Sequence, residues 1–170
     1  MLLMELEILT MDSKQLNELF GAAILTAEPE VSRYVYKITQ NVGGRTIIFF
    51  CCQDLRPEHE DEWRIDFTEE LELTDENADD EDFEQYVNHK TGKGHEFEVF
   101  AFIVACAKQF VKDKDPKIIR LKSEKEEANR APLYWRLAKR FGSGFDISQE
   151  TEERHDVTVM TKKGYVNIAK

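Results

Sequence analysis

The sequence predicts an α/β (α+β) domain in which a mixed, mostly antiparallel sheet is flanked by helices. Three observations support this fold class. Residues 31–67 hold short segments of alternating apolar and polar residues separated by turn-forming residues, a pattern typical of antiparallel strands. Residues 97–111 form a long apolar run that follows Thr91-Gly92-Lys93-Gly94. A strand-like segment and a second helix-like segment come next, as in one half of an α/β domain.

Length and composition predict one folded domain spanning residues 1–170. The chain has 170 residues, enough to bury a single core, and its apolar content of 41% is too high for a disordered protein. The first seven residues carry two glutamates and no positive charge, so they do not resemble a signal peptide. No apolar run approaches the roughly 20 residues that span a bilayer. We therefore expect a cytoplasmic protein without membrane contact.

The three cysteines support this compartment. They are Cys51, Cys52 and Cys106, an odd number, and two of them are adjacent. We interpret them as reduced, buried thiols of a protein from a reducing environment.

The negative charge is concentrated in one segment. The chain has a net charge of -11, and residues 54–84 hold sixteen acids and two bases. Residues 85–170 hold twelve acids and seventeen bases. We interpret residues 54–91 as an acidic loop or insertion within the single domain. Direct nucleic-acid binding is disfavoured by this segment, although the basic C-terminal half leaves it open.

The acidic segment is compatible with three interpretations. The first is a solvated insertion. The second is an electrostatic mimic that attracts a basic, nucleic-acid-binding partner, and the third is a calcium loop. An EF-hand requires a central Gly, and no Gly occurs between Glu69 and Thr91, so specific calcium binding is disfavoured.

The N-terminal half predicts a strand, a helix and a three-stranded meander. Residues 2–9 alternate with period 2, and a helix capped by Asp12 or Ser13 follows until the run around Pro29. The turn-forming Asn41-Val42-Gly43-Gly44 predicts a β-hairpin. The second strand of this hairpin is apolar throughout, so we expect it to be central and buried on both faces. The meander strands are predicted at residues 31–39, 46–52 and 63–67.

The C-terminal half predicts two helices and three strands. The first helix, residues 97–111, is apolar on most sides and should be surrounded by protein. The second, residues 128–141, has Asn129 as a possible N-cap and Pro132 in its first turn, and Gly142 is placed for a left-handed C-cap. Strands are predicted at residues 117–122, 145–151 and 157–161.

This order of elements resembles the GNAT superfamily of N-acetyltransferases. That family's core runs through a three-stranded meander, a helix, a strand, a helix and a closing pair of strands. Its Gln/Arg-x-x-Gly-x-Gly/Ala loop holds the pyrophosphate of coenzyme A, and His89-Lys90-Thr91-Gly92-Lys93-Gly94 is similar, with His89 in the first position. A closer likeness is to small bacteriophage proteins assigned a GNAT-like fold, in which an Arg-x-x-Leu-Tyr segment such as Arg130 to Tyr134 recurs.

The resemblance implies a set of site residues. Tyr134 matches the family's Tyr that protonates the departing thiolate of coenzyme A, so it is the candidate general acid. The family's Asn seven residues before that Tyr is replaced by Glu127, with Asn129 close by. The candidate residues for binding acetyl-CoA are His89, Gly92, Lys93, Gly94, Asn129 and Arg130.

Structural interpretations of the same residues stand beside these roles. Gly92 and Gly94 could simply form a flexible turn into a helix. Tyr134 lies on a helix stripe next to Leu133, a common place for a core residue, and Arg130 could pair with Glu126 or Glu127. The His and Cys residues have no zinc spacing, and no Gly-x-Ser-x-Gly or Walker sequence is present.

Two functions follow as hypotheses. The first is transfer of an acetyl group from acetyl-CoA to a small-molecule or protein amine, with solvent or a meander carboxylate such as Asp66 as the base. The second is a non-enzymatic GNAT-fold binding protein of phage type, whose acidic segment 54–84 docks on or inhibits a basic host protein in the host cytoplasm. Either a monomer or a homodimer is compatible with the sequence.

Overall fold

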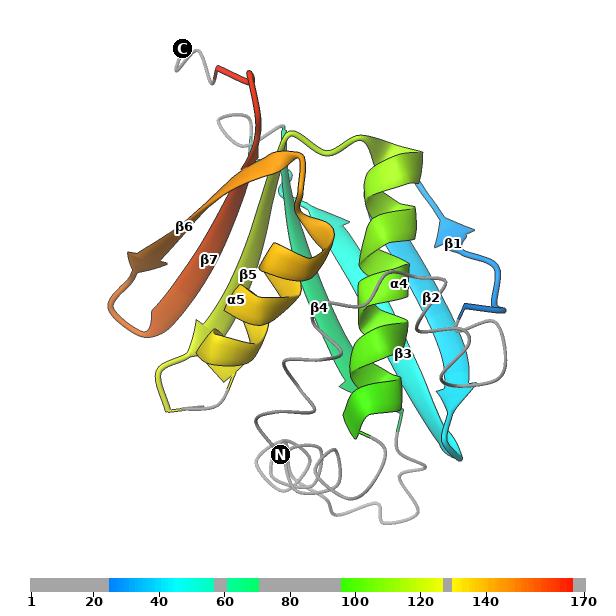
Figure 1. The fold of residues 1–170 in the computed structure, drawn as a ribbon. Helices are drawn as coiled ribbons and strands as arrows, with labels where there is room; N and C mark the ends of the chain where they lie inside the picture. Colours follow the sequence, from blue (N-terminus) through cyan, green and yellow to red (C-terminus); the bar gives the residue numbers. More distant parts are fainter. Residues whose placement is uncertain (1–24, 57–60, 71–95, 127–129, 167–170) are drawn as a thin grey trace.

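The computed structural model describes residues 25–56, 61–70, 96–126 and 130–166. These residues form a seven-stranded sheet, in the order β1-β2-β3-β4-β5-β7-β6, and two helices (Figure 1). The strands are β1 (Glu30–Val31), β2 (Val35–Val42), β3 (Arg45–Gln53), β4 (Glu62–Glu69), β5 (Ile118–Glu124), β6 (Phe145–Thr151) and β7 (His155–Lys162). The helices are α4 (Glu96–Lys114) and α5 (Arg130–Phe141).

The sheet has the mixed character that the sequence predicts. Every neighbouring pair of strands is antiparallel except β4 and β5, which are parallel. The fold class, a mixed and mostly antiparallel sheet with helices, is therefore confirmed. From β2 to β7 the elements also follow the order that the resemblance implies, a three-stranded meander followed by helix, strand, helix and two strands.

A tight turn between β2 and β3 fixes the register of the meander. Gly43 and Gly44 connect the two strands, and both have a positive φ, of 58° and 83°. The N–H of Gly44 donates to Oδ1 of Asn41 at 3.1 Å. Two consecutive residues with positive φ give the turn whose twist matches that of antiparallel strands. The hairpin predicted around residues 41–44 is present.

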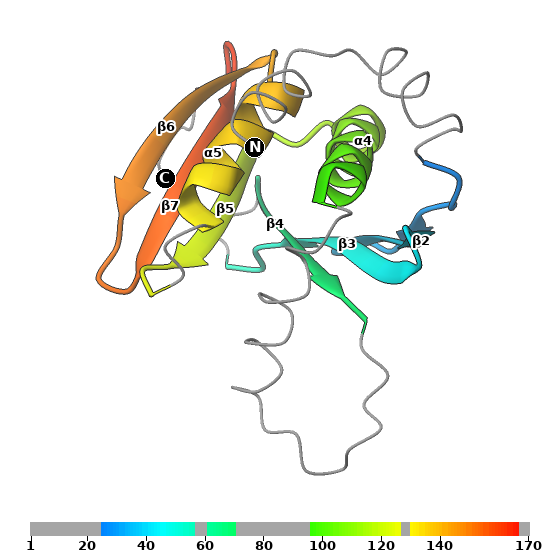
Figure 2. The ribbon, with the colours of Figure 1, turned by 60° about the horizontal axis from the view of Figure 1, so that its bottom comes forward.

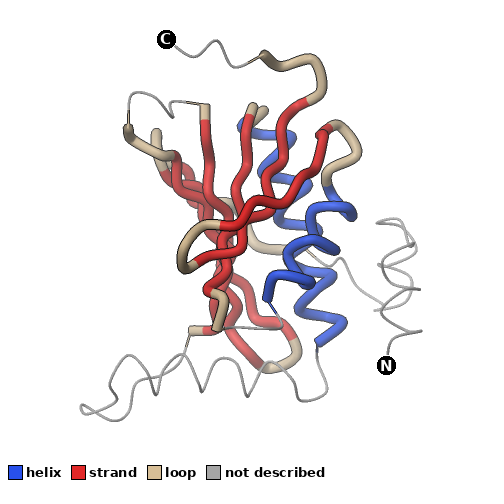
Figure 3. The backbone as a smooth tube through the Cα atoms, turned by 90° about the vertical axis from the view of Figure 1, so that its left-hand side faces the viewer, coloured by secondary structure: helices blue, strands red, loops and turns tan. Residues whose placement is uncertain are grey.

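Both described helices lie on the same face of the sheet (Figure 3). Helix α4 packs on β2 and β3, and α5 packs on β5 and β7. The core between the helices and the sheet is built from alternate residues of each strand and from the buried sides of both helices. Its largest fully buried side chains include Tyr36, Phe49, Ile65, Phe102, Phe110, Ile119, Leu121, Tyr134 and Leu137.

Helix α4 is held to the sheet by aromatic contacts and one buried hydroxyl. The ring of Phe110 lies edge-on to Tyr36 and to Trp63, with centroids 5.3 and 5.2 Å apart. The Tyr36 hydroxyl donates to Oδ2 of Asp113 at 2.7 Å. Burial, together with this carboxylate, raises the pKa of Tyr36, so the phenol stays neutral and keeps donating.

Strand β3 is central, as predicted, but it is not buried on both faces. Ile47, Phe49 and Cys51 are buried under α4, whereas Ile48 and Phe50 on the opposite face are only half-buried. The reason is that the described helices cover one face of the sheet. The same arrangement leaves Cys52 exposed, so the expectation that all three cysteines are buried is wrong for this residue.

Some predicted elements lie outside the described residues. These are the strand at residues 2–9, the helix that follows it, and the glycine-containing loop at residues 91–94. Within the predicted acidic loop, residues 54–91, the structure places β4 at Glu62–Glu69. The carboxylate-rich sequence therefore includes a strand of the central sheet.

Helix α5 ends at a glycine for a steric reason. The N–H of Gly142 donates to the carbonyl oxygen of Ala138 at 2.8 Å. Gly142 does not have the positive φ expected of a left-handed C-cap, since only Gly43, Gly44 and Gly164 have one among the described glycines. A Cβ on Gly142 would instead lie 2.5 Å from the Ala138 carbonyl oxygen and even closer to Cε of Met160.

We expect Gly142→Ala to destabilise the protein by about 1–3 kcal/mol, because the added methyl group overpacks against backbone that cannot move away. Gly144→Ala is the matched control, since no atom lies within 4 Å of a Cβ there. Urea unfolding of both variants measures the difference. Equal stability of the two variants would contradict this steric explanation.

Asp115 connects the end of α4 to the start of β5 and to β7. It has a positive φ of 45°, and its carboxylate accepts from Lys117 at 2.7 Å and from Lys162 at 2.5 Å. These hydrogen bonds, from Lys117 first and then Lys162, lower the pKa of Asp115 from its ordinary value of 3.8 to about 2. A lowered pKa in the folded state means that the contact stabilises the protein above pH 3.8 and is lost as the pH falls through about 2.

We therefore expect Asp115→Asn, which removes the charge and tolerates the positive φ, to be less stable than the parent at neutral pH. The difference should shrink as the pH falls from 4 towards 2, and added salt should reduce it because the carboxylate is exposed. Chemical unfolding across this pH range tests the prediction. A difference that stays constant down to pH 2 would show that the charge is not responsible.

Candidate active site

The candidate site lies where β4 and β5 separate. The two strands pair over only three residues each, Glu62 to Arg64 with Ile118 to Arg120. Beyond that point β4 continues beside β3 and β5 continues beside β7, so the two strands diverge (Figures 1 and 2). Helix α5 lies near the point where the two strands separate, on the same side of the sheet as α4 (Figure 2). The edge of β4 after Arg64 has no strand partner on the β5 side among the described residues.

Asp66 occupies this edge. Its Oδ1 accepts from the N–H of Phe67 at 2.9 Å and from the Tyr134 hydroxyl at 3.1 Å. Arg130 and Arg64 each place a guanidinium nitrogen 3.6 Å from this carboxylate. In the strand register Asp66 alternates with Ile65 and Phe67, so it belongs to the face opposite the helices. It reaches Tyr134 because β5 no longer stands beside β4 at this level.

Tyr134 reaches the same point from α5. Its side chain is 1% exposed, and its ring stands edge-on to Phe67 with centroids 5.9 Å apart. Burial first, and the charge of Asp66 second, raise the pKa of Tyr134 well above its usual range. The phenol is therefore protonated at neutral pH, and it donates to Asp66.

Arg130 lies one helical turn before Tyr134 and completes the cluster. Its Nη1 donates to the Tyr134 hydroxyl oxygen at 3.1 Å, and its guanidinium lies over the ring of Phe67, 5.3 Å from the centroid. The separation of four residues places Arg130 and Tyr134 on the same side of α5. We refer to Asp66, Arg130 and Tyr134 as the Asp-Arg-Tyr cluster.

The cluster combines a proton donor with a proton acceptor. Tyr134 offers a neutral phenol, and Asp66 offers a carboxylate 3.1 Å away. A nearby cation stabilises any negative charge that develops on either oxygen, and Arg130 provides it. The arrangement can therefore donate a proton and receive one, as general acid-base chemistry requires.

The structure brings together two of the residues that the resemblance implies. Tyr134 and Arg130 are both in the cluster, and Asp66, the meander carboxylate considered as a base, contacts both of them. The remaining candidates, His89, Gly92, Lys93, Gly94 and Asn129, lie outside the described residues. The sequence did not indicate that Phe67 belongs to the site. Its place in the period-2 pattern of β4 predicts only that its side chain faces the helices.

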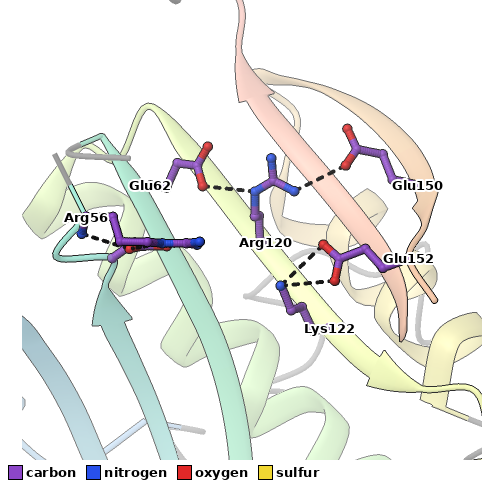
Figure 4. Close-up of polar contacts among 7 residues, drawn as sticks. Arg56, Glu62, Arg120, Lys122, Glu150 and Glu152 are labelled. Carbon is purple, nitrogen blue, oxygen red and sulfur yellow. Dashed lines mark hydrogen bonds and ion pairs between the residues drawn. The ribbon is translucent and has the colours of Figure 1, made fainter. Parts of the chain in front are cut away.

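A second charged cluster joins β4, β5 and β6 on the face of the sheet opposite the helices. Nε of Arg120 lies 3.0 Å from Glu62 on β4, and its Nη1 lies 3.2 Å from Glu150 on β6 (Figure 4). Nζ of Lys122 lies 3.3 Å from Glu152, which follows β6. Glu62 is buried, and both Arg120 and Lys122 belong to β5. These contacts link β5 to β4 and, across β7, to β6 and the residue that follows it, so we assign them a structural role.

Comparisons with known proteins give one structural likeness. The chain matches no protein-family model and no curated protein. Among solved structures it is similar to a mutant of the spermidine N-acetyltransferase SpeG from Vibrio cholerae, with 13% identity and a TM-score of 0.41. The match covers 86% of this chain and 72% of that chain.

No helix within the described ranges is long and apolar enough to span a bilayer. The His, Cys, Asp and Glu side chains of these residues form no group of three or more that could hold a metal ion.

We expect Tyr134→Phe to lower the free energy of unfolding by about 1–3 kcal/mol, because it removes a buried hydrogen bond to a carboxylate. A double-mutant cycle of Tyr134→Phe with Asp66→Asn should show an interaction energy, since the two side chains are bonded to each other. Tyr36→Phe is the matched control, because that phenol donates to Asp113 instead. Additive effects of Tyr134→Phe and Asp66→Asn would contradict the observed contact.

Proposed function

We propose that this protein is a GNAT-like N-acetyltransferase that moves an acetyl group from acetyl-CoA to an amine. The observation that carries the proposal is the divergence of β4 and β5 with the Asp-Arg-Tyr cluster at its edge. The edge of β4 beyond Arg64 suits the extended, amide-containing arm of coenzyme A, because an exposed strand edge can pair with such a group. The resemblance to GNAT N-acetyltransferases implies the same substrate, acetyl-CoA.

The cluster would provide the proton transfers. The amine nitrogen attacks the thioester carbonyl carbon, the carbon–sulfur bond breaks, and the leaving sulfur takes the phenolic proton of Tyr134. The raised pKa of Tyr134 keeps the phenol protonated at neutral pH but also makes it a weaker acid, so proton donation requires stabilisation of the phenolate that forms. The amine loses its proton to solvent or to Asp66. A proton received by Asp66 can then pass to the Tyr134 oxygen, which restores the starting state.

This mechanism requires one change in hydrogen bonding. In the structure the Tyr134 hydroxyl donates to Asp66, so it must turn towards the leaving sulfur during the reaction. Arg130, which already donates to the Tyr134 oxygen, would stabilise the phenolate that remains. Under this proposal His89, Gly92, Lys93 and Gly94 bind the pyrophosphate of acetyl-CoA, as the resemblance implies, and Asn129 is a further residue of the acetyl-CoA site. Glycine lets the backbone approach an anion, and a helix N-terminus favours negative charge.

A second candidate function is a non-enzymatic one. The Tyr134 hydroxyl is almost fully buried and is engaged by both Asp66 and Arg130, as expected of a purely structural group. Under this proposal the acidic segment, residues 54–84, docks on or inhibits a basic protein. Such an interaction should weaken with salt, because contacts between exposed charges are screened.

Calorimetric titration with acetyl-CoA and coenzyme A distinguishes the two candidates. The enzyme proposal expects binding on the order of micromolar Kd, lost in Gly94→Asp because a carboxylate there would repel phosphate. In acetylation assays on small diamines, lysine and lysine-containing peptides, Tyr134→Phe should lower kcat by about 10²–10⁴-fold while acetyl-CoA binding is retained.

Tyr36→Phe is the control for these assays, since it removes a comparable buried phenol that lies beside α4. It should leave turnover unchanged. Unchanged turnover in Tyr134→Phe would show that the assigned proton donor is wrong. No binding heat at millimolar ligand would rule out acetyl transfer and leave the non-enzymatic candidate.

A further inference from the structure

Exposed apolar side chains gather at one corner of the sheet. Five large apolar residues are exposed among the described residues, and four of them come from two neighbouring segments. These four are Val31, Tyr34, Val35 and Leu55, with exposed fractions of 55, 39, 39 and 68%. The fifth, Val166, follows β7 near the other end of the chain. We refer to the first four residues as the apolar corner.

Backbone contacts bring the two segments together. The N–H of Gln53 donates to the carbonyl oxygen of Tyr34 at 2.9 Å, and Leu55 follows two residues later. Val35 lies directly opposite Cys52 in the register of β2 and β3. Both segments therefore lie at the end of the sheet where β2 begins and β3 ends (Figure 1). Because Cys52 is exposed there, its thiol reports on access to this corner.

The charges around the apolar corner favour an acidic partner. The guanidinium of Arg33 lies over the ring of Tyr34, 5.0 Å from its centroid, and Lys114 donates to the carbonyl oxygen of Ser32 at 3.2 Å. Arg64 lies opposite Cys52 and is exposed, but it is shared with Asp66. Two acids of this corner have basic partners, since Glu30 lies 4.0 Å from Lys37 and Asp54 lies 2.6 Å from Arg56. The corner is thus basic on a chain whose net charge is -11.

We propose that the apolar corner binds the acidic stretch, residues 69–84, of a second copy of this chain. That stretch combines carboxylates with apolar residues, since Leu71, Leu73 and Phe83 stand between runs of Asp and Glu. The apolar corner is complementary to this stretch, because it has aromatic and aliphatic side chains with Arg33 beside them. Reciprocal docking of two copies closes a dimer rather than a chain. This inference does not depend on acetyl transfer.

The contact should be weak. Four exposed apolar side chains make a small interface, and two copies of net charge -11 repel each other at a distance. We expect a dissociation constant on the order of 10 μM to 1 mM, the range of small transient interfaces.

The experiment uses the full chain and two readouts. Sedimentation velocity over increasing protein concentration measures the dimer. The rate at which a maleimide modifies Cys52 measures cover of the corner, with Cys52→Ser as the background because Cys51 and Cys106 are buried. A synthetic peptide of residues 69–84 is the probe, and a peptide with Leu71, Leu73 and Phe83 replaced by Ser is its control. We expect sedimentation velocity to show a dimer at high protein concentration. The modification of Cys52 should be slower at high protein concentration and with the probe peptide, but not with the control peptide.

Paired variants locate the contact. Tyr34→Ser with Leu55→Ser, and separately Arg33→Glu, should weaken dimerisation at least about tenfold, about the effect of removing an interface anchor. Val166→Ser and Arg154→Glu are the controls, since both residues are exposed but lie elsewhere, and they should leave the dimer unchanged.

Three results would overturn the proposal. One is a monomer at every concentration with no effect of the peptide. Another is a dimer whose dissociation constant is unchanged by the substitutions in the apolar corner. The third is protection of Cys52 by the peptide while the full chain stays monomeric, because the corner would then accept an acidic segment without a second copy providing it.

Discussion

The parallel pairing of β4 with β5 over three residues joins the two halves of this sheet. On one side lie β1 to β4 under α4, and on the other lie β5, β7 and β6 under α5. Arg120 with Glu62 reinforces this short ladder on the face opposite the helices, and the Asp-Arg-Tyr cluster links β4 to α5 just beyond the end of the ladder. A short ladder also leaves the rest of the β4 edge unpaired by β5, which creates the candidate site.

The same junction explains why charged groups are buried there. Glu62 is almost completely covered, and it is compensated by Arg120 at 3.0 Å. Tyr134 is covered as well, and its hydroxyl has both a donor and an acceptor within 3.1 Å. Buried polar groups without such partners are strongly unfavourable. The contacts between the two halves of the sheet are therefore polar, whereas the core of each half is apolar. The acetyl transfer proposed for the protein would take place at these polar contacts.

Local signals in the sequence predicted most of the described fold. Alternation identified the meander, Asn41 with Gly43 and Gly44 identified the hairpin turn, and the apolar run after Gly94 identified α4. Contacts between distant residues could not be predicted. Asp66 alternates with residues that face the helices, so its bond to Tyr134 depends on the divergence of β4 and β5. Gly142 was expected to need a left-handed backbone, but it is required because a Cβ would clash with the carbonyl oxygen of Ala138 and with Met160. The sequence identified Tyr134 and Arg130 only through the resemblance.

The connection between the parallel strands has a consequence for how the chain folds. The β2–β3–β4 meander and the β6–β7 hairpin are closed by short connections, so they can form early. Pairing β4 with β5 requires closing the long segment from Glu70 to Lys117, which contains α4 and most of the acids of the acidic segment, residues 54–84. Closing a long segment costs conformational entropy, and like charges within it resist compaction. The last and slowest step of refolding should thus be the docking of the two halves, and it should become faster as ionic strength rises.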